Sequence, residues 1–410
     1  MQISGVTMQG GLNLIPPPAG PVNYDGNLNF GSFEVLDSSV AGYSNGFSSA
    51  WDSVNSKIIV AYQNYDGSSS PTATDGYISI GTVSGNSVSY GSAVKFSDQA
   101  TYGQVQSDCV AVCYDSNAQK GVVIWAGGSG SGISPCVYAR TITVSGTTCT
   151  LGSTTTLIVK CQAKNLRAVY DSTNNKVVVV FRNDFTVGVS EDDDGYSFVG
   201  TVSGTNISFG SKVTFSTNRV YGLDACFDSN NGKVVVVYND FTNYAGKAQI
   251  GTVSGTSISW GSQISVSSGQ IKDTAAVYDS TEERVVIMYR DGNDNLGKSK
   301  VGEVSGSSIT FGSAVTFNSD ANGQYHTSAY EPISKKVITT FMQSEKGKCV
   351  VGDVSGSSIS FLAKVDLGAS EINLGQWNST CAIGGSASIH VAFKNNSNSA
   401  KSTGVVATIT

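Results

Sequence analysis

Residues 274–317 read TAAVYDSTEERVVIMYRDGNDNLGKSKVGEVSGSSITFGSAVTF, and this stretch decides the fold. It holds four segments of strand-like composition, at about 274–278, 284–289, 298–304 and 309–317. Short runs rich in Val, Ile, Tyr and Thr between turn residues are typical of β-strands. The stretch therefore predicts a four-stranded antiparallel meander.

The same pattern recurs along the whole chain. One marker is an aromatic residue or Leu, mostly followed by Gly-Ser, and its copies begin at Phe30, Tyr90, Leu151, Phe209, Trp260, Phe311 and Phe361. A second marker is mostly aromatic-Asp-Ser, with copies at Trp51, Tyr114, Tyr170, Phe227, Tyr278 and Tyr330 and a degenerate copy at Ile383. Copies of the first marker lie 50 to 61 residues apart, a spacing typical of propeller blades.

The two ends of the chain each hold part of a repeat. The fragment around Phe30 has no second marker before it, and the fragment after Ile383 has no first marker behind it. Joined, they form one complete repeat, in which residues 27–36 supply the outer strand. We therefore predict an all-β, seven-bladed β-propeller of four-stranded antiparallel blades, whose ring is closed by the N-terminal outer strand joining the C-terminal blade. The expected propeller spans 23–410, with blades at about 47–99, 100–160, 161–217, 218–269, 270–321, 322–371, and 372–410 together with 23–39.

The strands of one repeat differ in composition, which orders them from the centre of the ring to its rim. The first is rich in small residues such as Ala275 and Ala276, which suits strands that converge on one axis. The second is apolar on both faces, as in KVVVVF at 176–181, and is expected to be buried on both sides. The fourth alternates, as in ISFGSKVTF at 207–215, which favours an outer edge strand.

The connections within and between repeats fall into two groups. Those between the first and second strands and between the third and fourth are short, as in DSTEER at 279–284 and VSGTS at 253–257. Asp in the first kind suits an Asx turn, and Gly in the second suits a positive φ. The other connections vary in length, and in a meander they lie at the opposite end. We call the two ends the turn face and the variable-loop face, and we expect function on the latter.

Composition argues against several classes of function. The net charge is -6 and Lys and Arg form no cluster, unlike in a nucleic-acid-binding protein. No run of about 18 apolar residues indicates a membrane span. The segment MQISGVTMQGGLNLIPPPAG lacks the basic and apolar regions of a secretory signal peptide. The eight cysteines contain no CxxC pair and are interpreted as reduced core residues.

Aromatic residues recur in the connections between blades and are candidate ligand-binding residues: Tyr43, Tyr102, Tyr221, Tyr325 and Trp377. Aromatic rings near a rim can stack on sugars, although packing between blades is the simpler interpretation. Trp377 is the strongest candidate, because Trp51 and Trp260 already fill repeat positions.

Alignment of the first strands brings charged residues to similar heights around the axis. Arg167 and Asp224 occupy the same register in adjacent blades, and Asp273 and His326 lie within two residues of it in the next two blades. Arg167 and Asp224 are therefore further candidates for ligand binding. An ion pair between blades is the simpler interpretation, and an anion or metal site is the alternative.

Glu191, Asp192 and Asp194 lie in an acidic loop and are candidate ligands of a structural Ca²⁺. Their spacing is not that of an EF-hand, and a solvated acidic turn is the alternative. No other cofactor is expected. The chain has only two histidines, His326 and His390, and no sialidase box, so we predict that it is not an enzyme.

The repeat YDSTNNKVVVVFRND…GTVSGTNISFGSKVTF resembles repeats in virion proteins of tailed bacteriophages, especially marine ones, over about residues 25–410. The resemblance implies a tail fibre, a tail-tip adhesin or a capsid decoration protein, located in the virion and assembled in the host cytoplasm. It assigns no functional residue. The opening GVTMQGGLNLIPPPAGPV looks like short leaders of such proteins. Residues 1–22 are therefore expected to form an extended anchoring arm, in which Pro16-Pro17-Pro18 favours polyproline II.

These observations predict a non-enzymatic virion protein that displays a propeller for attachment to a host surface or to other virion proteins. The expected partners are other virion proteins through the N-terminal arm, with a host-surface glycan and a second copy of the chain as further candidates. Nucleic acid and membrane insertion are not expected. A soluble lectin-like propeller is the alternative, followed by a glycan-cleaving enzyme.

Overall fold

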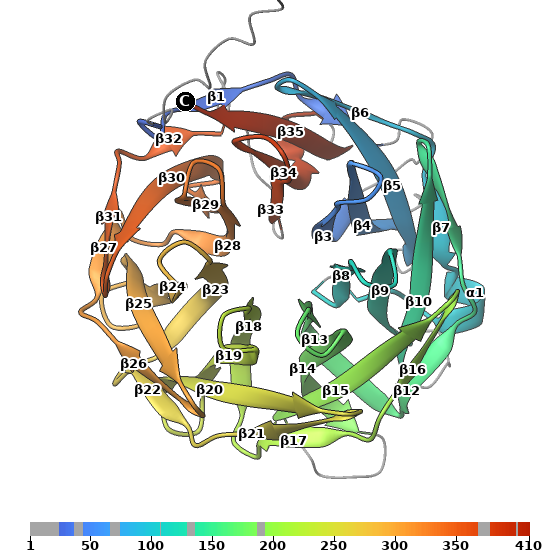
Figure 1. The fold of residues 1–410 in the computed structure, drawn as a ribbon, viewed down its shortest axis with the longest axis horizontal. Coiled ribbons are helices and arrows are strands. Elements are labelled where there is room, and N and C mark those ends of the chain that lie inside the picture. The colour runs from blue at the N-terminus through green and yellow to red at the C-terminus, as the bar shows by residue number, and fades with distance from the viewer. Residues whose placement is uncertain are drawn as a thin grey trace, which may run out of the picture.

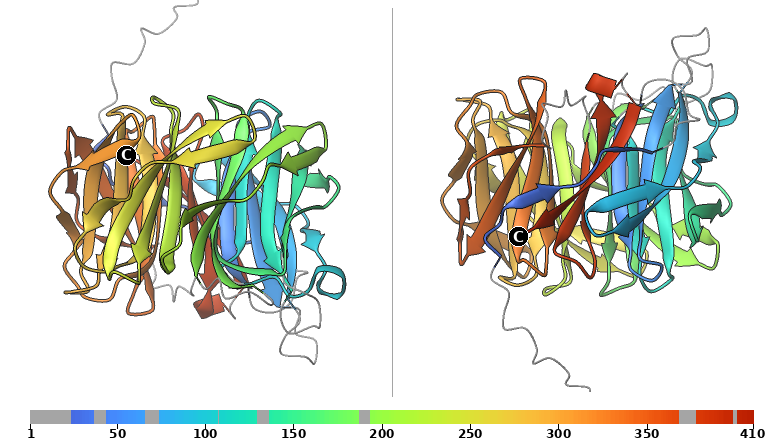
Figure 2. Two further views of the ribbon diagram at one scale, coloured as in Figure 1. Left: turned by 90° about the horizontal axis from the view of Figure 1, so that it is seen from below. Right: turned by 90° about the horizontal axis from the view of Figure 1, so that it is seen from above.

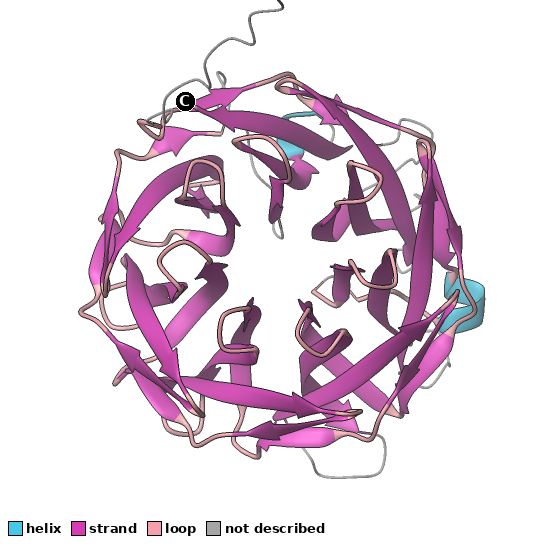
Figure 3. Ribbon diagram, viewed as in Figure 1, coloured by secondary structure: helices cyan, strands magenta, loops and turns pink. Residues whose placement is uncertain are grey.

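The computed structural model of the protein describes residues 24–36, 44–65, 74–106, 108–128, 136–186, 193–367, 378–398 and 401–410. Seven antiparallel sheets surround a central axis, which confirms the predicted seven-bladed β-propeller (Figure 1). Nearly all regular structure in the described chain is strand (Figure 3). The two helices of this part, α1 (Gln99–Tyr102) and η1 (Asn396–Asn398), are far too short to cross a membrane.

Six blades are each built from one continuous stretch of chain. Blade 1 contains β3 (Ser44–Asp52), β4 (Lys57–Tyr65), β5 (Thr74–Ser84), β6 (Ser87–Tyr90) and β7 (Val94–Ser97). Blade 2 contains β8 (Val110–Asp115), β9 (Lys120–Gly127), β10 (Cys136–Ser145), β11 (Thr148–Leu151) and β12 (Thr155–Val159). Blade 3 contains β13 (Cys161–Asp171), β14 (Lys176–Thr186), β15 (Asp194–Ser203), β16 (Asn206–Phe209) and β17 (Val213–Ser216).

Blade 4 contains β18 (Val220–Asp228), β19 (Lys233–Asp240), β20 (Ala245–Ser254), β21 (Ser257–Trp260) and β22 (Ile264–Ser267). Blade 5 contains β23 (Ile271–Asp279), β24 (Arg284–Asp291), β25 (Gly297–Ser305), β26 (Ser308–Phe311) and β27 (Val315–Asn318). Blade 6 contains β28 (Gln324–Glu331), β29 (Lys336–Gln343), β30 (Lys346–Ser355), β31 (Ser358–Phe361) and β32 (Val365–Asp366). The first strand of each blade lies nearest the axis (Figure 1).

Blade 7 combines both ends of the chain. Its inner strands are β33 (Ser379–Ile383), β34 (Ser388–Asn395) and β35 (Lys401–Ile409). Its outer strand comes from the N-terminal side, as β1 (Leu28–Phe30) and β2 (Glu34–Val35), and both pair antiparallel with β35. Leu28 lies opposite Ile409, and Figure 2 shows β1 alongside β35 at the rim.

The Gly of the first marker interrupts the outer strand of a blade. In blade 5, β26 and β27 both pair with β25 and are separated at Gly312. A Cβ atom on Gly312 would collide with the carbonyl oxygen of Ser357 in the next blade, so only glycine allows this close approach. Equivalent contacts occur at Gly31, Gly91, Gly152, Gly210 and Gly261. Blade 6 carries Leu362 instead, which packs against Gly26 where the two chain ends meet.

The short turns on the turn face follow the predicted chemistry. The Asp279 carboxylate accepts the backbone N–H groups of Thr281 and Glu282 at 2.9 and 3.0 Å. The corresponding residues Asp52, Asp115, Asp171 and Asp228 make the same kind of turn, and Glu331 does so in blade 6. The turns between third and fourth strands place Gly at φ of 59 to 62°, at Gly85, Gly146, Gly204, Gly255, Gly306 and Gly356.

The hydrophobic core consists of layers between adjacent blades. In β14, Val177 and Val179 pack in a cluster shared with blade 2, whereas Val178 and Val180 pack in a cluster shared with blade 4. All four side chains are fully buried, which confirms the expectation for strands that are apolar on both faces. Because each blade buries both faces against its neighbours, the ring is one packed body.

Candidate functional site

The inner strands carry a β-bulge at the same position in several blades. The first residue of the bulge has a left-handed conformation, with φ between 49 and 62°, at Gly46, Asn165, Gly222, Asp273 and Tyr325. A bulge adds one residue to a strand and bends it. In this propeller the bends lie where the inner strands border the axis.

A cavity of ≈ 400 Å³ lies on the axis and is bordered by the inner strands of all seven blades. Its wall has a charged half on blades 2 to 5, with Asp108, Arg167, Asp224 and Asp273. Its other half, on blades 6, 7 and 1, carries hydroxyl and amide groups: Thr327, Ser328, Asn378, Ser379, Thr380, Ser48 and Ser49. Every blade therefore contributes at least one polar side chain to the cavity wall, among apolar residues such as Val110 and Leu223.

The charged half is held together by bonds between blades. Arg167 Nε donates to Asp224 Oδ1 at 2.9 Å, so the structure brings together the two residues that the sequence placed at one register. Asp224 Oδ2 also accepts the N–H of Ala276 in blade 5 at 2.8 Å. Burial raises the pKa of the Asp224 carboxyl, and Arg167 opposes this shift. The structure thus contains the expected ion pair between blades, and a role of Arg167 and Asp224 in ligand binding stays a prediction.

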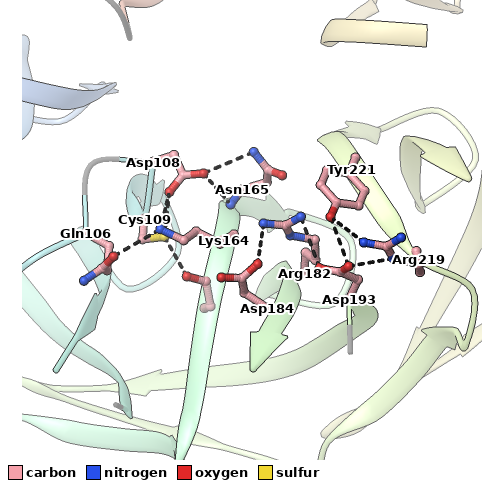
Figure 4. A network of polar contacts seen from close by, with 11 residues as sticks. Gln106, Asp108, Cys109, Lys164, Asn165, Arg182, Asp184, Asp193, Arg219 and Tyr221 are labelled. Atoms are coloured by element: carbon pink, nitrogen blue, oxygen red, sulfur yellow. Dashed lines mark hydrogen bonds and ion pairs between the residues drawn. The ribbon is translucent and has the colours of Figure 1, made fainter. Parts of the chain in front are cut away.

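Asp273 has the same kind of environment one blade further. Its Oδ2 atom pairs with Arg290 at 2.9 Å, and its Oδ1 atom accepts the N–H of Tyr325 in blade 6 at 3.0 Å. Asp108 Oδ2 likewise accepts the N–H of Asn165 in blade 3 at 3.3 Å (Figure 4). Each carboxylate of the cavity wall thus accepts a hydrogen bond from a neighbouring blade.

In the uncharged half of the cavity wall, hydroxyl groups form the hydrogen bonds between blades. The Thr327 hydroxyl lies 2.7 Å from that of Thr380, across the junction of blades 6 and 7. Ser379 Oγ accepts the N–H of Ser49 at 2.9 Å, across the junction of blades 7 and 1. The polar wall of the cavity is therefore an arrangement that holds the blades to one another.

His326 borders the cavity by its position but adds no charge to it, which corrects the sequence-based expectation. Its ring is buried, with a relative exposure of 4%, and packs edgewise on Phe317 and Phe341 at centroid distances of 5.3 and 5.7 Å. Burial lowers the pKa of His326 to about 4, so the ring is neutral near pH 7. Neither ring nitrogen has a hydrogen-bond partner in the described part of the chain.

A second polar cluster lies on the variable-loop face, between blades 3 and 4 (Figure 4). Its centre is Asp193, whose carboxylate lies 3.2 Å from Arg182 and 2.9 Å from Arg219 and accepts the Tyr221 hydroxyl at 3.0 Å. The Arg182 guanidinium also lies 4.1 Å from the centre of the Tyr221 ring, a cation–π contact. These contacts hold Tyr221 in one orientation.

Three aromatic rings continue outward from this cluster. Tyr221 and Phe241 lie 5.0 Å apart, and Phe241 and Tyr244 lie 5.3 Å apart. Tyr244 is 59% exposed, and no other aromatic side chain whose exposure the structure describes is exposed. We call Arg219, Tyr221, Phe241 and Tyr244 the rim patch. Sequence reasoning identified only Tyr221 among them, because no repeat position marks the other three.

The other candidate aromatic residues have different surroundings. Tyr102 packs on Tyr138 at a centroid distance of 5.1 Å and accepts a hydrogen bond from Arg140 at 3.0 Å, which supports the packing interpretation. Tyr325 is a bulge residue at the cavity. Tyr43 and Trp377 lie outside the described residues, so a binding role for them stays a prediction.

The structure leaves the Ca²⁺ prediction open. Glu191 and Asp192 lie outside the described residues, and Asp194 begins β15 opposite Asn183. The intervening Asp193 is the centre of the cluster with Arg182 and Arg219. Elsewhere in the described chain, no group of three His, Cys, Asp or Glu side chains is arranged to hold a metal. All eight cysteines are free thiols.

No protein-family model and no curated protein matches this sequence. Solved structures share its fold at low sequence identity. The Pseudomonas aeruginosa periplasmic gluconolactonase is 10% identical, with a TM-score of 0.54, over 79% of this chain and 86% of the other. The NanB sialidase of Streptococcus pneumoniae is 13% identical, with a TM-score of 0.52, over 92% of this chain and 71% of the other. These likenesses show that the chain shares the β-propeller fold.

Proposed function

We propose that this protein is a non-enzymatic structural protein of a tailed-phage particle. As a tail fibre, tail-tip adhesin or capsid decoration, it displays its propeller for attachment to a host surface or to other virion proteins. One observation carries the attachment role: the exposed Tyr244 of the rim patch lies on the variable-loop face, next to rings and arginines that are held in place. The virion setting rests on the resemblance of the repeats.

The cavity wall supports a scaffold role over catalysis. A general acid or base must reach the substrate with a free proton position. Asp224 and Asp273 each bond to an arginine through one oxygen and to a backbone N–H through the other. Each carboxylate therefore already joins its blade to a neighbouring one, which supports a scaffold role.

The test is to locate the protein and to measure turnover. Antibodies against the chain should label particles purified from an infected culture, and the label should remain on the particles through a density gradient. Deletion of residues 1–20 should leave a folded ring that is absent from the particles, because the arm is proposed to anchor it. Protein that remains free of particles at every step would contradict the virion role.

A soluble lectin-like propeller is the second candidate, and the same rim patch favours it. It predicts binding to glycans without association with particles. A glycan-cleaving enzyme would release product from a bound glycan, which we do not expect. Incubation of the full chain with each bound glycan, followed by mass spectrometry of the products, separates binding from hydrolysis.

A further inference from the structure

We propose that the rim patch binds an acidic saccharide. Tyr244 and Phe241 stack on a sugar ring, and Arg219 pairs with the carboxylate or phosphate of that sugar. The proposal rests on the proposed attachment function and names its ligand class and its site.

The first argument is the backbone conformation of Tyr244. This residue has φ of 53°, in the left-handed region that bulky side chains rarely adopt. Pairing registers align its turn with the turn of blade 5, because Tyr238 opposes Lys247 as Tyr289 opposes Lys298. The equivalent residue in blade 5 is Asn295, with φ of 60°, and Asn adopts this conformation readily. The turn itself therefore does not require an aromatic residue, and such strain points to a function.

The second argument is that the turn holds Tyr244 in a fixed position. Asp240 Oδ1 accepts the N–H of Asn243 at 3.0 Å, and Asp240 Oδ2 accepts the Asn243 side-chain amide at 2.7 Å. The Thr242 hydroxyl oxygen accepts the N–H of Arg219 at 3.0 Å, which ties this turn to the adjacent connection. A ring that is exposed and already ordered loses little entropy when a ligand stacks on it.

The third argument is the charge of the outer surface. The Arg219 side chain is 49% exposed, whereas that of its partner Asp193 is only 7% exposed, so the positive group faces solvent. Arg219 uses Nε to bond Asp193 and Nη2 to bond Tyr221. A guanidinium has five N–H donors, and these two bonds leave a fork that matches a carboxylate or phosphate.

The fourth argument is the mixture of ring faces and polar groups. The ring planes of Tyr221 and Phe241 are tilted by 45° to each other, and those of Phe241 and Tyr244 by 41°. The three rings together form a stepped apolar surface. Thr242 and Asn243 are exposed beside it. A sugar presents C–H groups on its ring faces and hydroxyl groups at its edges, and this combination suits an apolar platform with polar neighbours.

The experiment uses the full chain on an array of bacterial oligosaccharides. The array holds members with uronic acid or phosphate groups, each beside its carboxyl-reduced or dephosphorylated counterpart. We expect the parent chain to bind acidic members, and Tyr244→Asn to weaken this binding by about tenfold or more. Arg219→Gln should remove the preference for acidic members over their neutral counterparts. Tyr244→Asn copies the residue of blade 5, so its melting temperature should not fall.

Val159→Asn is the matched control, because Val159 is a 60% exposed apolar residue in blade 2, away from the rim patch. It should leave binding unchanged. Absence of binding to any acidic saccharide, or full binding by Tyr244→Asn, would overturn the proposal. The virion role would remain intact in that case if the protein still sediments with particles. Loss of Tyr244→Asn protein from the particles would instead identify the patch as a protein interface and would also overturn the saccharide assignment.

Discussion

Ser49 and Ser379 are 330 positions apart in the sequence, yet the backbone N–H of Ser49 donates to Ser379 Oγ at 2.9 Å. The bond joins blade 1 to blade 7, next to the axis. Comparable bonds cross other junctions, where Ser48 Oγ accepts from Val112 and Asp224 Oδ2 accepts from Ala276. All three acceptors occupy the same register position of their inner strands, opposite Ala61, Val237 and Ala392 of the second strands. This register position therefore links a blade to the one that follows it.

Removal of the acceptor at the closing junction should destabilise the ring. Ser379→Ala leaves the partly buried N–H of Ser49 without its partner, so we expect a loss of about 1 kcal/mol in the free energy of unfolding. Urea unfolding followed by tryptophan fluorescence measures this loss. Ser254→Ala, in an exposed turn of blade 4, is the control and should change stability little. Equal stability of both variants would show that the bond does not contribute.

Deletion of residues 1–40 tests the outer strand of blade 7. The deletion removes β1 and β2 and leaves the edge of β35 unpaired. Unpaired edges promote association between chains, so we expect aggregation or a markedly lower melting temperature. Size-exclusion chromatography and calorimetry report both. A monomer with unchanged melting would contradict the role of this strand.

Gly312→Ala tests the close contact between the outer strand and the next blade. The added methyl group would collide with the Ser357 carbonyl, and we expect destabilisation by about 1–3 kcal/mol, as in overpacked cores. Leu362→Gly is the reciprocal change, at the junction where no glycine is needed. It should not raise stability, because it removes packing on Gly26. Chemical denaturation of both variants checks the pair.

The Arg167–Asp224 pair should contribute to stability across the junction of blades 3 and 4. Asp224→Ala leaves both Arg167 and the N–H of Ala276 without their acceptor, and we expect a loss of about 2 kcal/mol. Arg167 is partly exposed, so the pairwise coupling in a double-mutant cycle with Arg167→Ala should be only about 1 kcal/mol. A coupling near zero would assign the effect to the Ala276 bond.

His326 should make the ring sensitive to acid. Burial lowers its folded pKa to about 4, whereas the unfolded chain has the ordinary value of about 6.5. Above pH 6.5 the ring is neutral in both states. Between about pH 6.5 and 4 only the unfolded state gains the proton, so stability falls as pH falls, by up to about 3 kcal/mol.

His326→Leu isolates this effect, because Leu166 and Leu223 occupy the same register position in blades 3 and 4. The variant should lose less stability between pH 7 and pH 4 than the parent chain. The remaining loss should include His390, whose pKa burial lowers to about 3. Melting temperatures measured along this pH series give the comparison, and parallel curves for the two proteins would contradict the assignment.

Repetition explains how much could be read from the sequence. The markers around Asp279 and Gly312 recur because each solves a local problem, a tight turn or a close backbone contact, in nearly every blade. The apolar run at 176–181 has no polar face, so it must be buried on both sides. Arg167 and Asp224 could be paired because they occupy one register in adjacent repeats.

The site could be predicted only in part, because it depends on side chains that break the repeat. Arg182 in β14 and Asp193 just before β15 meet within blade 3, and Arg219 joins them from the connection to blade 4. The turn between β19 and β20 places Tyr244 beside Phe241 and leaves it exposed. His326 looked like a charged residue at the cavity, but its bulge position directs the ring between Phe317 and Phe341, where burial keeps it neutral.

The sequence by itself determined the number of blades, the order of strands within each blade and the chemistry of the turns, because these depend on local spacing and on residue type. Only the tertiary structure decided that the cavity groups bond blade to blade, that Asp193 is shared by two arginines, and that Tyr244 is exposed in a left-handed turn. Contacts between successive blades join residues about 50 positions apart, as in the Asp224–Ala276 bond, and the closing contact of Ser49 with Ser379 spans 330 positions. Their geometry follows from how the packed sheets meet.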